Sequence, residues 1–152
     1  MLNEDTSRTT SRLLYLLKRL SDSWFCNELC HENIEGFNNS YIPVFMSIGT
    51  AGISNSKLAS NLTITKQAAS KVIKELEELG LVCSEKCSTD GRLMMLYLTS
   101  KGAAFYGHLK GQIVALEQEY KKVVGAKNYE TAIDVMSKLV KYHEELNKME
   151  AV

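Results

Sequence analysis

The chain has 152 residues, of which 45% are hydrophobic and 24% charged, and this composition is typical of one soluble globular domain. It contains a single proline and no apolar run near the roughly 18 residues of a membrane span, and its polar N-terminus lacks a secretory signal, so we expect a cytoplasmic protein. Lys plus Arg and Asp plus Glu both number 18, so any affinity for nucleic acid has to come from a local cluster of charge.

The N-terminal third of the sequence predicts a long helix followed by a short one. Apolar residues recur at helical spacing over residues 8–34, on a stripe wide enough to be buried on two sides. Gly36 is the expected stop of this helix, and residues 38–40 supply polar caps for a short helix that begins near Pro43.

Two further helices are predicted from their caps. Ser54 is placed to cap a helix over residues 56–61, and Thr65 to cap the helix over residues 66–79, which ends at Gly80. The apolar positions of this last helix fall in one arc: Ala68, Ala69, Val72, Ile73, Leu76 and Leu79.

The opposite arc of the same helix is polar and basic. It carries Lys66, Gln67, Ser70, Lys71 and Lys74, whereas the acids Glu75, Glu77 and Glu78 are confined to the second half. Glutamine and serine can bond base edges, and lysines can bond phosphates, so this arc is a candidate DNA-binding face. Taken alone, it is equally consistent with a solvated surface helix.

The remaining elements complete a known layout. Two short apolar runs, 81–87 and 93–98, flank residues 88–91 as a hairpin; Thr99 caps a second long helix, and Gly125 separates it from a last helix. Three helices followed by a hairpin form a winged helix-turn-helix, whose third helix enters the major groove of DNA. We therefore expect a mainly α fold with a small β-hairpin wing and flanking helices.

The stretch from Gly80 to Gly102, G-LVCSEKCST-DGR-LMMLYLTSKG, resembles the MarR (multiple antibiotic resistance regulator) family pattern. That pattern has a helix-ending glycine, a D-x-R wing and an LTxxG start to the next helix, and ISNSKLASNLTIT at residues 53–65 resembles the preceding family segment. The resemblance implies that Arg92 enters the minor groove with Asp90 bracing it, and that the helix from Thr65 reads the major groove.

By the same resemblance, residues 1–152 form a single domain, with a DNA-binding lobe over about residues 41–99 and dimerisation helices over about 5–36 and 100–150. The implied protein is a homodimeric repressor without a cofactor or bound metal, which binds a pseudo-palindromic operator in double-stranded DNA and is released by a small aromatic ligand. The DNA-binding residues expected from face and family are Thr65, Lys66, Gln67, Ser70, Lys71, Lys74, Asp90 and Arg92.

Cysteine chemistry offers one alternative. Cys26, Cys30 and His31 could with His108 form a zinc site, as in metal-sensing members of the family, although no second histidine lies one turn from His108. No cysteine lies near the start of the first helix, where peroxide-sensing members carry one. A metal- or redox-responsive regulator is therefore the less favoured form of the hypothesis.

Two other classes compete with the regulator. An enzyme is not indicated, because no nucleophile, base and oxyanion motif can be assembled from the sequence. A winged-helix protein-interaction module without DNA binding is favoured by the neutral net charge, and Arg92 is the one arginine of the wing. Such a wing predicts modest affinity for DNA that depends sharply on salt.

Overall fold

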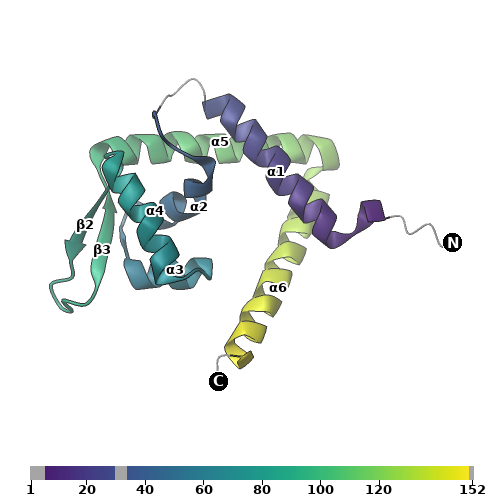
Figure 1. Cartoon of the computed structure of the whole chain (residues 1–152). Coiled ribbons are helices and arrows are strands. Elements are labelled where there is room, and N and C mark those ends of the chain that lie inside the picture. The colour runs from purple at the N-terminus through teal and green to yellow at the C-terminus, as the bar shows by residue number, and fades with distance from the viewer. Residues whose placement is uncertain (1–5, 30–33, 151–152) are drawn as a thin grey trace. The chain divides into compact units, whose positions relative to one another are not determined.

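The computed structural model describes residues 6–29 and 34–150 (Figure 1). Two compact units can be distinguished, Met1–Lys110 and Gly111–Val152, and each is described by itself. Within the described ranges, no helix is long and apolar enough to cross a membrane.

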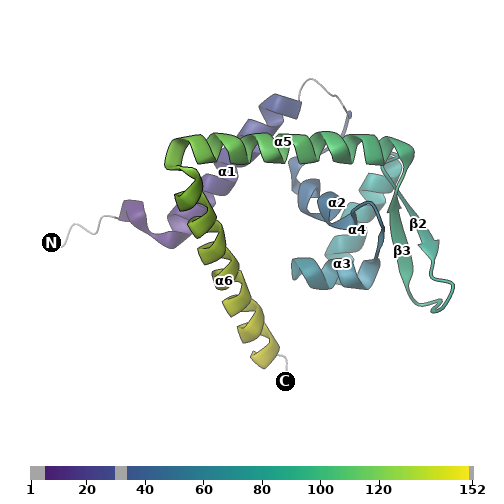
Figure 2. The ribbon, with the colours of Figure 1, turned by 180° about the vertical axis from the view of Figure 1, so that it is seen from behind.

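The first unit contains most of the predicted elements, together with two 3-10 turns and one short strand that the sequence did not predict. The bounds are η1 Thr6–Arg8, α1 Thr10–Leu29, η2 Asn39–Tyr41, α2 Ile42–Ile48, β1 Ile53–Ser54, α3 Asn55–Leu62, α4 Lys66–Glu78, β2 Val82–Lys86, β3 Met94–Leu98, and α5 Ser100–Val124, which continues into the second unit. The mainly α fold with a hairpin wing is confirmed. Figures 1 and 2 show the hairpin of β2 and β3 beside the short helices α2, α3 and α4.

The caps predicted for three helices are confirmed. The hydroxyl of Ser54 accepts from the Lys57 amide at 3.2 Å, and that of Thr65 accepts from the Ala68 amide at 3.0 Å. The Thr99 hydroxyl likewise accepts from the amide of Gly102, the third residue of α5. These side chains satisfy amide groups that have no partner within the helix, and therefore fix where each helix begins.

The cap predicted for α2 differs from the one found, and the described residues do not test the predicted end of α1. The described part of α1 ends at Leu29, and residues 30–33 lie outside the described residues, so Gly36 is not seen as its cap. The Asn39 side-chain amide donates to the Asp22 carbonyl at 2.8 Å, which holds the returning chain against α1. Asn38 caps the 3-10 turn η2 through the Ser40 amide and does not cap α2 itself.

A third strand completes the sheet, in the order β1-β3-β2, with both pairs antiparallel. In β1, Ile53 pairs with Leu96 and Ser54 with Met95. This strand was missed because two residues show no alternation of apolar and polar positions. Gly52 precedes it, and a Cβ there would lie 2.5 Å from the Tyr97 ring, so the close approach of the strands requires glycine.

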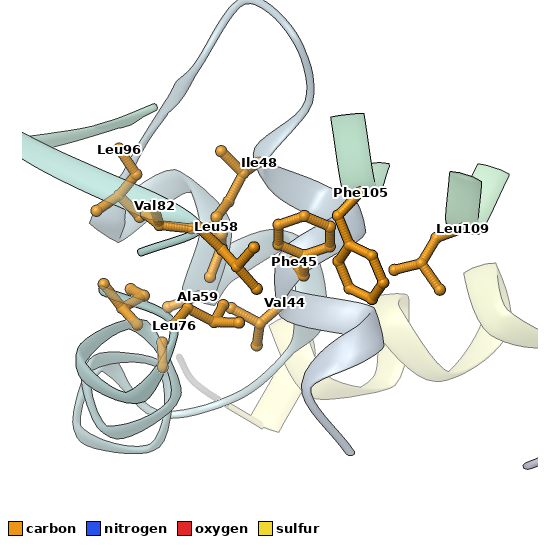
Figure 3. Close-up of a cluster of buried hydrophobic side chains, with 13 residues drawn as sticks. Val44, Phe45, Ile48, Leu58, Ala59, Leu76, Val82, Leu96, Phe105 and Leu109 are labelled. Atoms are coloured by element: carbon orange, nitrogen blue, oxygen red, sulfur yellow. The ribbon is translucent and has the colours of Figure 1, made fainter. Parts of the chain in front are cut away.

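The core of the first unit lies between the short helices, the sheet and the start of α5 (Figure 3). Phe45 and Phe105 pack with ring centroids 5.6 Å apart, and Phe37 adds a second contact to Phe105 at 4.8 Å. The largest fully buried side chains are Phe45, Ile48, Leu58, Leu76, Leu81, Leu96 and Leu109. This packing of helices on one sheet holds α4 and the wing in one lobe.

The joint between α4, β2 and α5 is closed by several hydrogen bonds. The Thr99 hydroxyl donates to the Gly80 carbonyl at 2.6 Å, the Thr99 amide donates to the Leu81 carbonyl at 3.1 Å, and Lys101 Nζ donates to the Leu79 carbonyl at 2.9 Å. A Cβ built at Gly102 would lie 1.9 Å from the Leu81 carbonyl oxygen. The LTxxG segment therefore places the first turn of α5 directly against the end of α4.

The second unit contains the end of α5 and α6, Ala126–Glu150, separated by Gly125. The rings of Tyr120 and Tyr129 lie 6.5 Å apart, and Lys121 Nζ lies 3.5 Å from Glu130 Oε1. These contacts join the two helices across their turn. Whether residues 1–152 act as one domain with the predicted subdivision stays a prediction.

Candidate nucleic-acid interface

The predicted DNA-binding face of α4 is exposed in the structure. Ala69, Ile73 and Leu76 point into the core, whereas the N-cap Thr65 and the following polar side chains are open to solvent: Lys66, Gln67, Ser70, Lys71 and Lys74. Ala68, a member of the predicted apolar arc, is exposed, because it lies at the edge of that arc in the first turn. The structure thus places the candidate side chains on one accessible surface of α4.

The acids of α4 are engaged with neighbouring elements. A hydrogen bond with Glu75 raises the pKa of Tyr41 above its ordinary value. The Ser84 hydroxyl of β2 donates to Glu77 Oε1 at 2.6 Å. Both carboxylates are therefore held by the lobe, and the first two turns of α4 carry positive charge without a neighbouring acid on the same helix.

The wing tip is shaped by Asp90, but by a contact that differs from the expected one. Its Oδ1 accepts from the backbone amide of Arg92 at 3.0 Å, and its carbonyl accepts from the Leu93 amide at 3.1 Å. No ion pair between Asp90 and the Arg92 guanidinium is present among the described residues. Asp90 makes the turn, as Asp-Gly sequences commonly do, and Arg92 is exposed beside it.

Three of the cysteines belong to the residues that the structure describes, and these three form no disulfide with one another. Cys26 and Cys83 are exposed, and Cys87 is half buried, with its sulfur 3.2 Å from the Thr89 hydroxyl. This hydrogen bond and those of the Thr89 and Asp90 amides lower the pKa of the Cys87 thiol. Cys30 and His31 of the alternative zinc site lie outside the described residues, and the residues that the structure describes contain no cluster of three metal-ligating side chains.

A shallow groove of about 120 Å³ separates α4 from the wing strands. It is lined by Asn55, Ser70, Ile73, Lys74, Glu77, Ser84, Met94 and Leu96. Three of these polar residues, Asn55, Glu77 and Ser84, were absent from the predicted site. The sequence could have indicated Ser84. It lies two residues after Val82, on the same face of the strand, and a hydroxyl on a buried face needs a hydrogen-bond partner.

Known proteins resemble the chain at the level of family and fold. Residues 49–94 match the model of the MarR family. A protein of Thauera aromatica named as a transcriptional regulatory protein for the hcr operon is 24% identical over 94 residues. That match covers 62% of this chain and 57% of the relative, so the chain spans less than two thirds of the relative's length.

The solved structures similar to this one include several MarR proteins. The MarR protein from Peptoclostridium difficile has a TM-score of 0.80 at 18% identity, with 95% of this chain and 94% of that chain covered. The complex of MepR from S. aureus with DNA has a TM-score of 0.75 at 16% identity, with 88% and 97% covered. PcaV from Streptomyces coelicolor, solved with its natural ligand, has a TM-score of 0.73 at 16% identity, with 93% and 98% covered. Residues 49–94 therefore resemble the MarR family, and the chain has the winged-helix fold of the solved MarR structures.

Proposed function

We propose that this protein is a cytoplasmic, homodimeric repressor that binds a pseudo-palindromic operator in double-stranded DNA. The observation that carries the proposal is the exposed face of α4, where lysines surround Gln67 and Ser70 without an acid among them. The MepR structure, whose fold is similar, was solved with DNA. The family and fold are those of transcription regulators and not of enzymes.

Each residue of the proposed interface has a distinct role. Gln67 and Ser70 would contact base edges in the major groove, with Lys66 or Lys71 beside them, and Lys74 would bind phosphate. Thr65 fixes the start of α4 through the Ala68 amide. Arg92 would enter the minor groove from the wing, with Asp90 shaping the turn that presents it.

Binding to generic duplex DNA at low and at high salt tests this function most directly. Retention that falls steeply with salt, followed by selection of a preferred sequence from random duplexes, would support the regulator. A chain that is not retained even at low salt would instead be a winged-helix interaction module, the function that the zero net charge favours. A small aromatic effector, the remaining part of the proposal, would show as ligand-dependent release of the selected operator.

The dimer is proposed from apolar surface that each unit leaves exposed. On α6, large hydrophobic side chains recur along the helix with a third or more of their area exposed: Val135, Met136, Leu139, Val140, Tyr142, Leu146 and Met149. On α1, the same holds for Leu13, Leu14, Tyr15, Leu17 and Leu20. Exposed apolar surface of this extent is typical of an interface between subunits.

We therefore expect light scattering to give twice the 17.0 kDa of one chain at micromolar concentration. Replacing Leu139 and Val140 of α6 by Asp should shift the protein toward the monomer, because the charges would have to be buried in the interface. Lys138→Asp, at a neighbouring exposed position, is the matched control for added negative charge. A folded wild-type monomer under these conditions would contradict the dimer and the two-fold operator with it.

Lys74→Ala should weaken binding to all DNA sequences alike, because the role proposed for this side chain is a contact with phosphate. The slope of log affinity against log salt should fall by about 1, as expected for the loss of one phosphate contact. Fluorescence anisotropy with the selected operator and with scrambled duplexes measures both effects, and Lys138→Ala on α6 is the control. A changed order of preference among operators would show that Lys74 reads bases and that the proposed orientation of α4 is wrong.

A further inference from the structure

The wing is attached to the rest of the lobe over a short length. β3 pairs with β1 only at Leu96 and Met95, whereas β2 and β3 pair with each other as far as Lys86 and Met94. Leu96 of β3 is 1% exposed and packs into the core of the lobe. Toward the wing tip, the groove lies between the strands and α4. Something other than packing has to fix the direction of the outer hairpin.

Two hydrogen bonds cross this region, one to each strand. The Ser84 hydroxyl of β2 donates to Glu77 of α4 at 2.6 Å, a short bond to a carboxylate oxygen. Asn55 Oδ1 at the start of α3 accepts from the Met94 amide of β3 at 3.4 Å. Both bonds involve residues that line the groove, and each ties one wing strand to a different helix of the lobe.

The side chain of Asn55 extends the pairing between β1 and β3. The β1–β3 register pairs Ser54 with Met95, so the next pair would bring residue 55 opposite Met94. The backbone of Asn55 already belongs to α3, and its side-chain oxygen takes the position of a strand acceptor for the Met94 amide. The side chain thus extends the support of β3 by one residue toward the tip.

We propose that Glu77 and Asn55 are positioning residues that act through Ser84 and Met94 to set the direction of the wing relative to α4, and so the place of Arg92. This inference rests on the proposed DNA-binding function. Arg92 lies in the turn, two residues from the start of β3 at Met94, so a small rotation of the hairpin at the two bonds would move the guanidinium away from the DNA minor groove. Glu77 of α4 thereby serves DNA binding without contacting DNA.

A double-mutant cycle with Arg92 tests the proposal. Ser84→Ala removes the donor without changing charge, and we expect operator affinity to fall by about fivefold in the wild-type background and by less than about twofold when residue 92 is already Ala. Ser84→Thr keeps the hydroxyl and should restore most of the affinity. Ser88→Ala, at an exposed position of the tip, is the control and should bind as the wild type does.

Hydrogen exchange in the absence of DNA gives a second measurement. Asn55→Ala should speed exchange of the Met94 amide while that of Leu96 stays protected, and Asn55→Asp, which keeps the acceptor, should restore protection. An equal loss of affinity for Ser84→Ala with and without Arg92 would overturn the inference, since the bond would then support stability alone. Unchanged affinity for Ser84→Ala in a wild type that binds operator would also overturn it, while failure of the wild type to bind any operator would instead overturn the proposed function.

Discussion

Gly102→Ala should lower the free energy of unfolding by about 3 kcal/mol or more, although alanine is the better helix former by about 1 kcal/mol. The added Cβ would lie 1.9 Å from the Leu81 carbonyl oxygen, and that oxygen belongs to the backbone at the start of the sheet. Neither partner can move without breaking the bonds of Thr99 to Gly80 and Leu81. Steric overlap therefore outweighs helix propensity at this position.

Denaturation by urea at a fixed protein concentration measures the effect, since the stability of a dimer depends on concentration. Gly107→Ala is the matched control: it lies on the same helix, and a Cβ there meets no atom within 4 Å. That variant should be as stable as the wild type or more stable by up to about 1 kcal/mol. A Gly102→Ala protein with unchanged stability would mean that α5 does not start against Leu81 in solution.

Arg92→Ala should leave folding and dimerisation intact but weaken operator binding by about 1 to 3 kcal/mol. Arg92 is the only arginine after Arg19 and is exposed at the wing tip, so no other guanidinium of the lobe can replace it. A narrow, A·T-rich minor groove concentrates negative potential, which an extended guanidinium can enter. The loss should accordingly be larger on operators with A·T-rich flanks.

Anisotropy titrations at near-physiological salt measure this loss, and two further variants separate its causes. Arg92→Lys keeps the charge but not the planar donor group, so the affinity recovered by lysine reports charge alone. Asp90→Ala should lose less and add little to Arg92→Ala, because Asp90 acts through the backbone of Arg92. Unchanged affinity of Arg92→Ala would remove the wing from the binding mechanism.

Three of the predicted helices that the structure confirms begin at residues whose side chains bond nearby amides. The caps Ser54, Thr65 and Thr99 bond amides three residues away, so the sequence contains the whole signal. Strand β1 contains no such signal, because its two residues form a strand only by pairing with Leu96 and Met95 more than forty positions later. The contact of Asn39 with Asp22 was likewise not predicted, since it joins residues 17 positions apart.

In the candidate site, too, the sequence predicts features within one helix but not contacts between elements. Helical periodicity alone predicts which side of α4 carries Lys66 and Gln67, and the structure exposes both. The contact between Ser84 and Glu77 depends on how β2 lies against α4, and spacing along the chain does not predict it. Asp90 bonds the backbone amide of Arg92 and not its guanidinium. Which of the two groups it bonds depends on the geometry of the turn, and a D-x-R pattern does not specify that geometry.

The closed joint at Gly80, Thr99 and Gly102 limits where the length of the chain can vary. The wing joins the lobe where β2 begins, after Gly80 and Leu81, and where β3 ends, before Thr99. Hydrogen bonds from Thr99 to the Gly80 and Leu81 carbonyls hold these two ends together, so a residue inserted at either end would displace α5 from the end of α4. The loop of residues 88–91 is exposed, so insertions there should leave the joint untouched. Relatives of this protein can therefore differ in the reach of the wing while α4 keeps its place in the lobe.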